Sequence, residues 1–236
     1  MKFRIVVLAL LLPAAACSGP VAARHWNRGD ALAEKGERNG AIREYREAIR
    51  LKPASPELHN QLGIAFSKNG DLDDTIAEFR EAVRLKPDHS SIHYNLGNAL
   101  LKKGDADGAI AEYRKSILLE PTAQARYNLG IALTRKGDLD SAIAEYREAI
   151  RLRPNDSSTH YNLANALIKK NDVDGAIAEY REAVRLEPSS AKFHYCLGRA
   201  LTQRADRNGA IKEFRTAVTL DPQYDVSRRD GQTVTK

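Results

Sequence analysis

Proline residues divide this chain into segments of almost constant length, and this spacing restricts the fold more than any other feature. The intervals between successive prolines of the series are 34, 34, 33, 34 and 34 residues. A period of this size is the signature of repeat architectures, in which one unit cannot bury its apolar face alone and packs against the next. The sequence therefore predicts stacked copies of one unit. The series is Pro53, Pro87, Pro121, Pro154, Pro188 and Pro222.

The third segment shows two apolar stripes with helical spacing. Leu96, Ala99 and Leu100 fall on one face of a first helix,. Gly104 interrupts this pattern, and a second stripe ends at Pro121, because proline cannot continue a helix,. Each segment is therefore expected to be a helix–turn–helix unit.

Each segment also carries the same marks at fixed distances from its proline. An aromatic residue stands eight positions before the proline, and a small residue stands five positions before it. A leucine–glycine pair lies earlier in four segments, with Leu163-Ala164 as a variant in another. The aromatic series is Tyr45, Phe79, Tyr113, Tyr146, Tyr180 and Phe214, and the pairs begin at Leu62, Leu96, Leu129 and Leu197.

These marks resemble the tetratricopeptide repeat. The resemblance covers residues 24–222 and implies an all-α fold, a right-handed superhelical α-solenoid of stacked helix–turn–helix repeats,. The first copy is degenerate, since Arg28-Gly29 stands where leucine–glycine is expected. Residues 223–236 are expected to form a polar C-terminal tail. The six expected copies cover about 24–55, 56–89, 90–122, 123–156, 157–190 and 191–222.

The N-terminus has the three-part composition of a secretory signal. A basic start, Met1–Arg4, precedes the apolar run IVVLALLL, which is too short to span a bilayer,. We expect residues 1–16 to be a cleaved signal peptide and the chain to be exported. Small residues directly before Cys17 resemble a bacterial lipoprotein cleavage site. Cys17 is therefore a candidate for lipidation, at the start of a short tether over residues 17–23.

Two processing routes remain open. In the first, a lipid on Cys17 anchors the chain to the membrane, and Ser18 favours an outer-membrane lipoprotein facing the periplasm. Lipoproteins usually have leucine three positions before the cysteine, where this chain has Ala14. In the second, ordinary cleavage after Ala16 or Ala23 leaves a soluble periplasmic or secreted protein.

The family resemblance places the first helix of every copy on the concave side of the superhelix, where tyrosine and asparagine recur. Amides offer donors and an acceptor, so a ladder of them can hydrogen-bond an extended peptide, while tyrosine rings add contact area. The alternative is that the tyrosines pack between helices and the asparagines are merely tolerated. The groove residues expected from this ladder are Tyr94, Asn95, Asn98, Tyr127, Asn128, Tyr161, Asn162, Asn165 and Tyr195.

Basic residues border this ladder near the ends of the first helices. They favour an acidic segment or a terminal carboxylate, although cations in this position also complement the helix dipole. Some family members hold a terminal carboxylate with a Lys/Asn/Lys/Arg set, and this chain departs from that pattern by placing tyrosine before the groove asparagine. The basic residues assigned to the groove are Lys102, Arg135, Lys169 and Arg199.

Composition and motif content argue against other functions. Without residues 1–16 the chain has 35 basic and 31 acidic residues, interspersed with one another, so no nucleic-acid partner is expected,. Five of the six histidines share one repeat position, which is typical of a packing residue rather than a metal ligand,. No phosphate-binding loop or catalytic set occurs, so we expect no enzyme activity, cofactor or metal.

Two further patterns concern the second helices. Glutamate and arginine recur two positions apart, as in Glu78 and Arg80, and we interpret them as charges of the solvated convex face. The third copy departs from its neighbours over residues 115–122, where the linker after Pro121 is one residue short. This is either neutral drift or a local change of superhelical pitch with Leu118 as an exposed apolar contact.

These observations favour a non-enzymatic protein–protein interaction scaffold of the bacterial cell envelope. It would bind an extended or helical peptide segment of a partner protein in its groove, by analogy with outer-membrane assembly subunits or pilotins. The alternative is a soluble secreted or periplasmic repeat protein without a lipid anchor. A nucleic-acid-binding helical repeat is a remote alternative, because it fits poorly with export.

Overall fold

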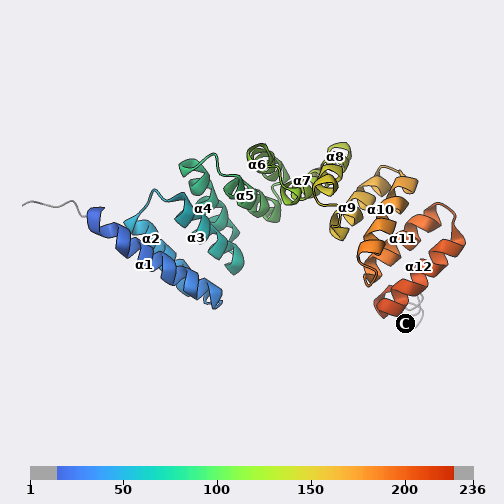
Figure 1. Cartoon of the computed structure of the whole chain (residues 1–236), viewed down its shortest axis with the longest axis horizontal. Coiled ribbons are helices and arrows are strands. Elements are labelled where there is room, and N and C mark those ends of the chain that lie inside the picture. Colours follow the sequence, from blue (N-terminus) through green and yellow to red (C-terminus); the bar gives the residue numbers. More distant parts are fainter. Residues whose placement is uncertain (1–14, 226–236) are drawn as a thin grey trace, which may run out of the picture. The chain divides into compact units, whose positions relative to one another are not determined.

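The computed structural model describes residues 15–225, with side chains from residue 19 onward (Figure 1). Within this range the chain forms α-helices and one short 3-10 helix, which confirms the expected all-α fold class. The helices are α1 (Ala15–Glu34), α2 (Arg38–Leu51), α3 (Pro56–Asn69), α4 (Leu72–Leu85), α5 (Ser90–Lys103), α6 (Ala106–Leu119), α7 (Ala123–Lys136), α8 (Leu139–Leu152), α9 (Ser157–Lys169), α10 (Val173–Leu186), α11 (Ala191–Gln203), α12 (Arg207–Leu220) and the 3-10 helix η1 (Pro222–Tyr224).

The helices form two compact units. The first contains α1–α5, and the second contains α6–α12 with η1. Within each unit, a helix packs mainly against the helices before and after it in the sequence. Each copy therefore buries the apolar face that its neighbour presents, as expected of stacked helix–turn–helix repeats.

The closest approach within a copy joins a glycine of the first helix to the aromatic ring of the second. A Cβ atom built at Gly63 would lie 2.7 Å from the Phe79 ring, and one at Gly130 would lie 2.5 Å from the Tyr146 ring. Burying a large apolar side chain stabilises a fold by about 1.5–3 kcal/mol. The leucine–glycine pair and the aromatic residue seen in the sequence are therefore the two halves of one contact.

The turn between the two helices of a copy requires one residue with left-handed backbone geometry. Asn171 and Ala205 occupy this position in the last two copies, with φ of 63° and 65°. Asparagine tolerates such angles, whereas the Cβ of alanine crowds the following carbonyl oxygen. The earlier copies use glycine, at Gly36, Gly70, Gly104 and Gly137.

The first helix begins ahead of the first expected copy. Because α1 starts at Ala15, residues 17–23, which we predicted to form a short tether, are helical. Residues 1–14, which make up most of the predicted signal peptide, and the side chain of Cys17 lie outside the described part of the chain. The lipid on Cys17 stays a prediction. Among the described helices, none combines the length and apolar character needed to cross a membrane.

Within residues 15–225, the last helix is less covered than the inner second helices. Ile177 of α10 is 1% exposed, whereas Ile211, at the same repeat position in α12, is 49% exposed. The η1 segment packs against α12, and the ring of Tyr224 is centred 5.1 Å from the ring of Tyr195 of α11. Residues 226–236 of the predicted polar tail lie outside the described range.

The third copy is irregular in its contacts as well as in its sequence. In the next copy, Arg151 bonds Glu148 at 2.7 Å on the surface of α8. The matching positions in α6 hold Leu118 and Lys115, and Lys115 bonds Glu112 instead. Leu118 is 86% exposed, so its expected exposure is confirmed. The change of superhelical pitch stays a prediction.

Replacing Ala205 with glycine should stabilise the protein. Glycine removes the steric strain of a left-handed alanine, which is about 1–2 kcal/mol, while adding some unfolded-state entropy, so a net gain of about 1 kcal/mol is expected. Urea unfolding measures the effect. Asn171→Gly is the matched control and should gain less, since asparagine already tolerates this geometry; equal gains, or a loss at Ala205, would contradict the strain argument.

Candidate functional site

The expected groove residues all lie on first helices. Asn95 and Asn162 are half-buried, whereas Lys102 and Lys169 are exposed near the ends of their helices. Helix α5 carries Tyr94, Asn95, Asn98 and Lys102, helix α7 carries Tyr127, Asn128 and Arg135, helix α9 carries Tyr161, Asn162, Asn165 and Lys169, and helix α11 carries Tyr195 and Arg199.

The amide ladder joins successive first helices to one another. Asn162 Nδ2 of α9 donates to the hydroxyl oxygen of Tyr127 of α7 at 2.8 Å. Asn95 Nδ2 donates to Asn60 Oδ1 at 3.0 Å, with Asn60 at the repeat position that tyrosine holds elsewhere. The residues in both pairs are 35 positions apart. The asparagines therefore have a structural role that the sequence pattern did not reveal.

The bond between first helices uses only some of the hydrogen-bonding groups of the asparagine amide. A side-chain amide has two donor hydrogens and one acceptor oxygen. The bond to Tyr127 uses one donor of Asn162, and the side chain is only half-buried. The assignment of these asparagines to a binding groove stays a prediction, now combined with a role in stacking.

The groove tyrosines pack between helices, which is the alternative left open by the sequence. The rings of Tyr127 and Tyr146 have centroids 6.2 Å apart. The ring of Tyr161 stacks on Phe193 of the next copy at 5.0 Å. Burial, helped by the charge of Asp156, raises the pKa of Tyr127. The Tyr127 hydroxyl therefore stays protonated at neutral pH.

A pocket of about 240 Å³ lies between the first helices of the second and third copies. Its floor is apolar, with Phe79 from the second helix α4, and its polar groups come from α3 and α5. Three predicted groove residues meet here, namely Asn95, Asn98 and Lys102. The full lining is Ile64, Ser67, Lys68, Phe79, Asn95, Asn98, Ala99 and Lys102.

A smaller pocket of about 120 Å³ occupies the same position between α9 and α11 of the last two copies. Tyr180 forms its floor and donates a hydrogen bond from its hydroxyl to Asn165 Oδ1 at 2.7 Å. Burial raises the pKa of the Cys196 thiol. The full lining is Asn165, Ile168, Tyr180, Cys196, Arg199, Ala200 and Gln203.

Sequence reasoning missed the non-ladder residues of these pockets. Ile64 and Phe79 of the first pocket match Asn165 and Tyr180 of the second in repeat position. A signal for Ile64 was present, because it occupies the repeat position that Asn98 and Asn165 hold in other copies.

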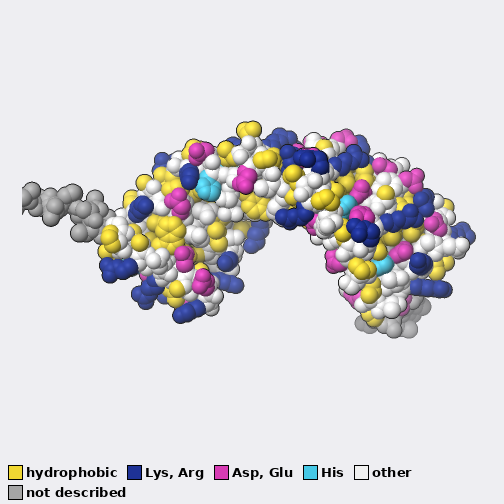
Figure 2. All heavy atoms as spheres, viewed as in Figure 1, with side chains coloured by type: hydrophobic (Ala, Val, Ile, Leu, Met, Phe, Trp, Pro, Cys, Tyr) yellow, Lys and Arg dark blue, Asp and Glu magenta, His cyan; other side chains and the backbone are white. Residues whose placement is uncertain are grey.

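The paired basic residues differ in their partners. The outer lysine of each pair reaches an aspartate at the start of the preceding second helix. Lys103 lies 2.6 Å from Asp73, and Lys170 lies 2.9 Å from Asp140. Figure 2 shows the resulting mixture of basic and acidic side chains over the visible surface of both units. The basic border is therefore partly neutralised within the fold.

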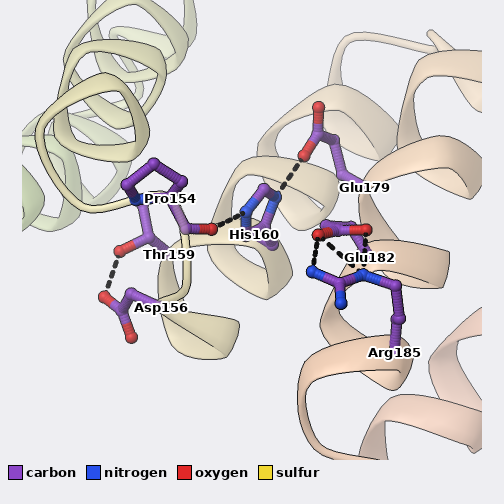
Figure 3. Close-up of polar contacts among 7 residues, drawn as sticks. All are labelled: Pro154, Asp156, Thr159, His160, Glu179, Glu182 and Arg185. Atoms are coloured by element: carbon purple, nitrogen blue, oxygen red, sulfur yellow. Dashed lines mark hydrogen bonds and ion pairs between the residues drawn. The ribbon is translucent and has the colours of Figure 1, made fainter.

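The shared histidines link the two helices of a copy, as Figure 3 shows for the fifth copy. His160 Nδ1 lies 2.7 Å from Glu179 Oε2, and Nε2 lies 3.0 Å from the carbonyl oxygen of Pro154. His59 and His194 have the same two contacts. This confirms the interpretation of the histidines as packing residues.

The same contacts correct our interpretation of the glutamates. We interpreted the glutamate series, which includes Glu78, Glu179 and Glu213, as surface charges of a solvated face, and that is wrong. Their side chains are only 25%, 29% and 16% exposed, and each bonds a buried histidine. The bond brings the glutamate of the second helix onto the first helix, so it belongs to the packing of the copy.

The fourth copy replaces histidine with Arg126. Its Nη1 bonds Glu145 at 2.8 Å, but its buried Nε has no hydrogen-bond partner among the described residues. Pro121 stands five positions before Arg126, whereas Pro154 stands six before His160. The shortened linker and the loss of histidine therefore occur together.

Models of the tetratricopeptide repeat match most of the chain. One model described by that name matches residues 60–123 and 94–157, and another matches residues 145–178. A model described as the TPR repeat matches residues 29–70 and 164–204. No curated protein matches the chain.

Solved repeat proteins have the same fold. MamA from Desulfovibrio magneticus RS-1 is 26% identical and aligns over 73% of this chain and 98% of its own, with a TM-score of 0.70. PilF of Pseudomonas aeruginosa is 18% identical over 92% and 98%, with a TM-score of 0.73. YrrB, described as a TPR protein with an unusual peptide-binding site, is 17% identical over 80% and 97%, with a TM-score of 0.68. The likeness to PilF and YrrB shows the fold alone.

The histidine contacts predict that stability decreases as the pH rises above neutrality. The hydrogen bond that His59 donates to the Glu78 carboxylate is the main cause that raises the pKa of His59. For His160, burial opposes the rise, but the contacts with Glu179 and Pro154 and the charge of Glu182 outweigh it. A raised folded-state pKa gives stability that is complete below about pH 6.5 and is lost as the pH rises through the folded value.

Urea unfolding at about pH 6 and about pH 8.5 tests this expectation. The wild-type protein should be more stable at the lower pH. Glu78→Gln with Glu179→Gln should reduce the difference between the two pH values, because the neutral amide no longer favours the imidazolium. An undiminished difference in this variant would assign the pH dependence to other groups.

Proposed function

Because the chain belongs to the tetratricopeptide repeat family of protein–protein interaction scaffolds, we propose that it binds a peptide segment of a partner protein along its first helices. The observation that supports this most directly is the pocket between α3 and α5, where half-buried amides border an apolar floor. Backbone amides of a peptide need such donors and acceptors, and its side chains need apolar contact.

The recurrence of the pocket supports an elongated ligand. Residues at equivalent repeat positions line a pocket in the first unit and a pocket in the second unit. An extended segment places its side chains at regular intervals, which a repeating surface can match. YrrB has a peptide-binding site and the same fold, and this lends the proposal support by analogy.

We further propose that the protein acts in the bacterial cell envelope, as an assembly or pilotin-like adaptor anchored through Cys17. The apolar run IVVLALLL and the small residues before Cys17 support export and lipidation,. The fold likeness to PilF is compatible with such a role. A soluble periplasmic or secreted protein remains the second candidate, because Ala14 departs from the usual lipoprotein pattern.

A pair of variants separates the binding role of the amide ladder from its stacking role. Both Asn162→Ala and Tyr127→Phe remove the hydrogen bond between α7 and α9. Each should therefore lose roughly 1 kcal/mol of stability. Only Asn162→Ala also removes the amide, so only this variant should lose peptide affinity, by about fivefold to tenfold.

The peptides for this test are selected from a random library displayed against the wild-type mature chain. Fluorescence polarisation gives their affinities for both variants, and thermal unfolding gives the stabilities. Failure to select any peptide would overturn the proposed function. Equal loss of affinity in both variants would show that Asn162 acts only through stacking.

Intact-mass measurement of the mature protein from a bacterial membrane fraction tests the anchor. A mass that includes a diacylglycerol-modified Cys17 at the N-terminus is expected. Replacing Cys17 with alanine should release the protein from the membrane fraction. A wild-type protein that begins at residue 17 without lipid, or at Arg24, would contradict the anchor and support the soluble alternative.

A further inference from the structure

A groove of about 590 Å³ lies on α12, the last α-helix of the second unit (Figure 1). Its apolar lining comes from Ile211, Phe214 and Val218 of α12 and from Tyr224 of η1. Within residues 15–225, α12 packs mainly against α11 and η1, whereas α2, α8 and α10 each pack between two first helices. In the described part of the chain, α12 therefore lacks the second neighbour that an inner second helix has.

The first two copies show what covers this surface of an inner second helix. Ile42 of α2 belongs to one buried apolar cluster with Leu62 and Phe66 of α3, and Ile49 packs against the same cluster. The guanidinium of Arg46 lies over the Phe66 ring, 5.3 Å from its centroid. The residues of α12 at the repeat positions of Ile42, Arg46 and Ile49 are Ile211, Arg215 and Val218, and all three line the groove. The groove is therefore a surface that a helix with large apolar residues one turn apart would cover.

Two other segments of the chain lack this apolar pattern. In α1, Arg28 stands at the repeat position of Leu62, and its side chain reaches Glu44 at 3.3 Å. Stacking α1 of a second molecule on α12 would therefore bring a charge against an apolar groove, which is unfavourable. In residues 226–236 the only apolar residues are Val226 and Val234, eight positions apart. Neither segment supplies two large apolar side chains one turn apart.

Helix α12 itself has the required pattern. Ile211, Phe214 and Val218 fall at i, i+3 and i+7, on one face of the helix,. Ile211 is half-exposed within this structure. A two-fold axis brings the same surface of two molecules together, so each α12 would cover the groove of the other. Removing these side chains from water favours the association.

The charges of the groove are also compatible with a second molecule of the same chain. Its lining contains one cation, Arg215, and one anion, Asp225. Among the described residues, the Arg215 side chain forms no ion pair. In a two-fold interface, a contact between Arg215 of one molecule and Asp225 of the other occurs twice. The groove therefore meets an identical groove with opposite charges available on both sides.

We propose that two molecules of this chain associate through their α12 grooves. Ile211 and Phe214 of each molecule are covered by the other, and Arg215 of each faces Asp225 of the other. Each molecule contributes only one helix and η1, so the interface is at the small end of the range for specific complexes, and dissociation constants in the micromolar range are expected. The inference concerns a second surface and does not depend on the proposed peptide binding.

Sedimentation equilibrium of the mature chain tests the association, at loading concentrations from low micromolar to several hundred micromolar. Cys17→Ala removes any lipid that would itself associate the molecules, and a reducing agent prevents a disulfide through Cys196, which is a free thiol. An equilibrium between monomer and dimer is expected. A monomer at every concentration would overturn the proposal and leave the groove to a helix of another protein. Species that grow beyond the dimer would indicate head-to-tail contact and would also overturn it.

Ile211→Asp and Leu118→Asp form the matched pair of variants. Both place a negative charge at an exposed apolar residue of the second unit, but only Ile211 lines the groove. Ile211→Asp should weaken the dimer at least about tenfold, because the two-fold interface contains the substitution twice. Leu118→Asp should change the dissociation constant by no more than about twofold. Equal weakening would assign the association to general surface hydrophobicity and contradict the proposal.

A charge exchange provides a second test that does not depend on the folding of Ile211→Asp. Arg215→Asp places two acidic groups at each contact and should weaken the dimer at least about threefold, since each exposed pair contributes modestly and occurs twice. Adding Asp225→Arg to the same chain restores opposite charges, so the double variant should return to within about twofold of the wild type. Thermal unfolding checks that both variants fold. A double variant as weak as Arg215→Asp would show that the two grooves do not face each other.

Discussion

The helix pairs within each unit depend on one contact, in which the aromatic ring of the second helix lies against a glycine of the first helix. The ring fills the space that a larger side chain of the first helix would need. At Gly198 a Cβ atom would stand 2.8 Å from the Phe214 ring, much as at Gly63 and Gly130. The fifth copy accommodates Ala164 beside Tyr180, and both are almost fully buried. This small-to-large contact allows the two backbones to approach, and the other interactions of the copy require that approach.

Three recurring kinds of polar contact stabilise the structure around this contact, and each joins helices that are near one another in the sequence. A histidine and a glutamate join the two helices of one copy, as His160 joins Glu179. An asparagine joins two successive first helices, and a lysine joins a first helix to the preceding second helix. Because stability is then a sum of nearest-neighbour terms, a polar residue on the first helices can serve stacking and binding together. A substitution on the first helices that alters binding will therefore also alter stability. Substituting its hydrogen-bond partner gives a control that shows how much of the effect comes from stability.

The sequence was sufficient to predict the features that depend on the repeat period and on the pattern of apolar and polar residues. The proline spacing, the leucine–glycine pairs and the aromatic series predicted the helices, their pairing and their stacking. Hydrogen bonds between residues of different helices could not be predicted in the same way. The bond from Asn162 to Tyr127 spans 35 positions, and the contact of Glu179 with His160 depends on how far one helix is rotated against the other. Rotation is set by side-chain packing, so the periodicity that placed Glu179 on a helix could not show that it faces inward.

The fourth copy shows how closely these local terms are coupled. In the second, fifth and sixth copies a proline carbonyl six residues before the histidine accepts a contact from its Nε2, so the linker length and the imidazole form one unit. Shortening the linker after Pro121 by one residue moves that carbonyl relative to the helix, and a histidine in the place of Arg126 would keep only its glutamate. Arginine retains the glutamate bond through Nη1 and adds a permanent charge, but its Nε is buried and has no hydrogen-bond partner in the described part of the chain. A buried unpartnered donor costs about 1–3 kcal/mol. The one-residue deletion is therefore a local weakness at the junction between the third and fourth copies, where it changes both the linker and the residue that follows it.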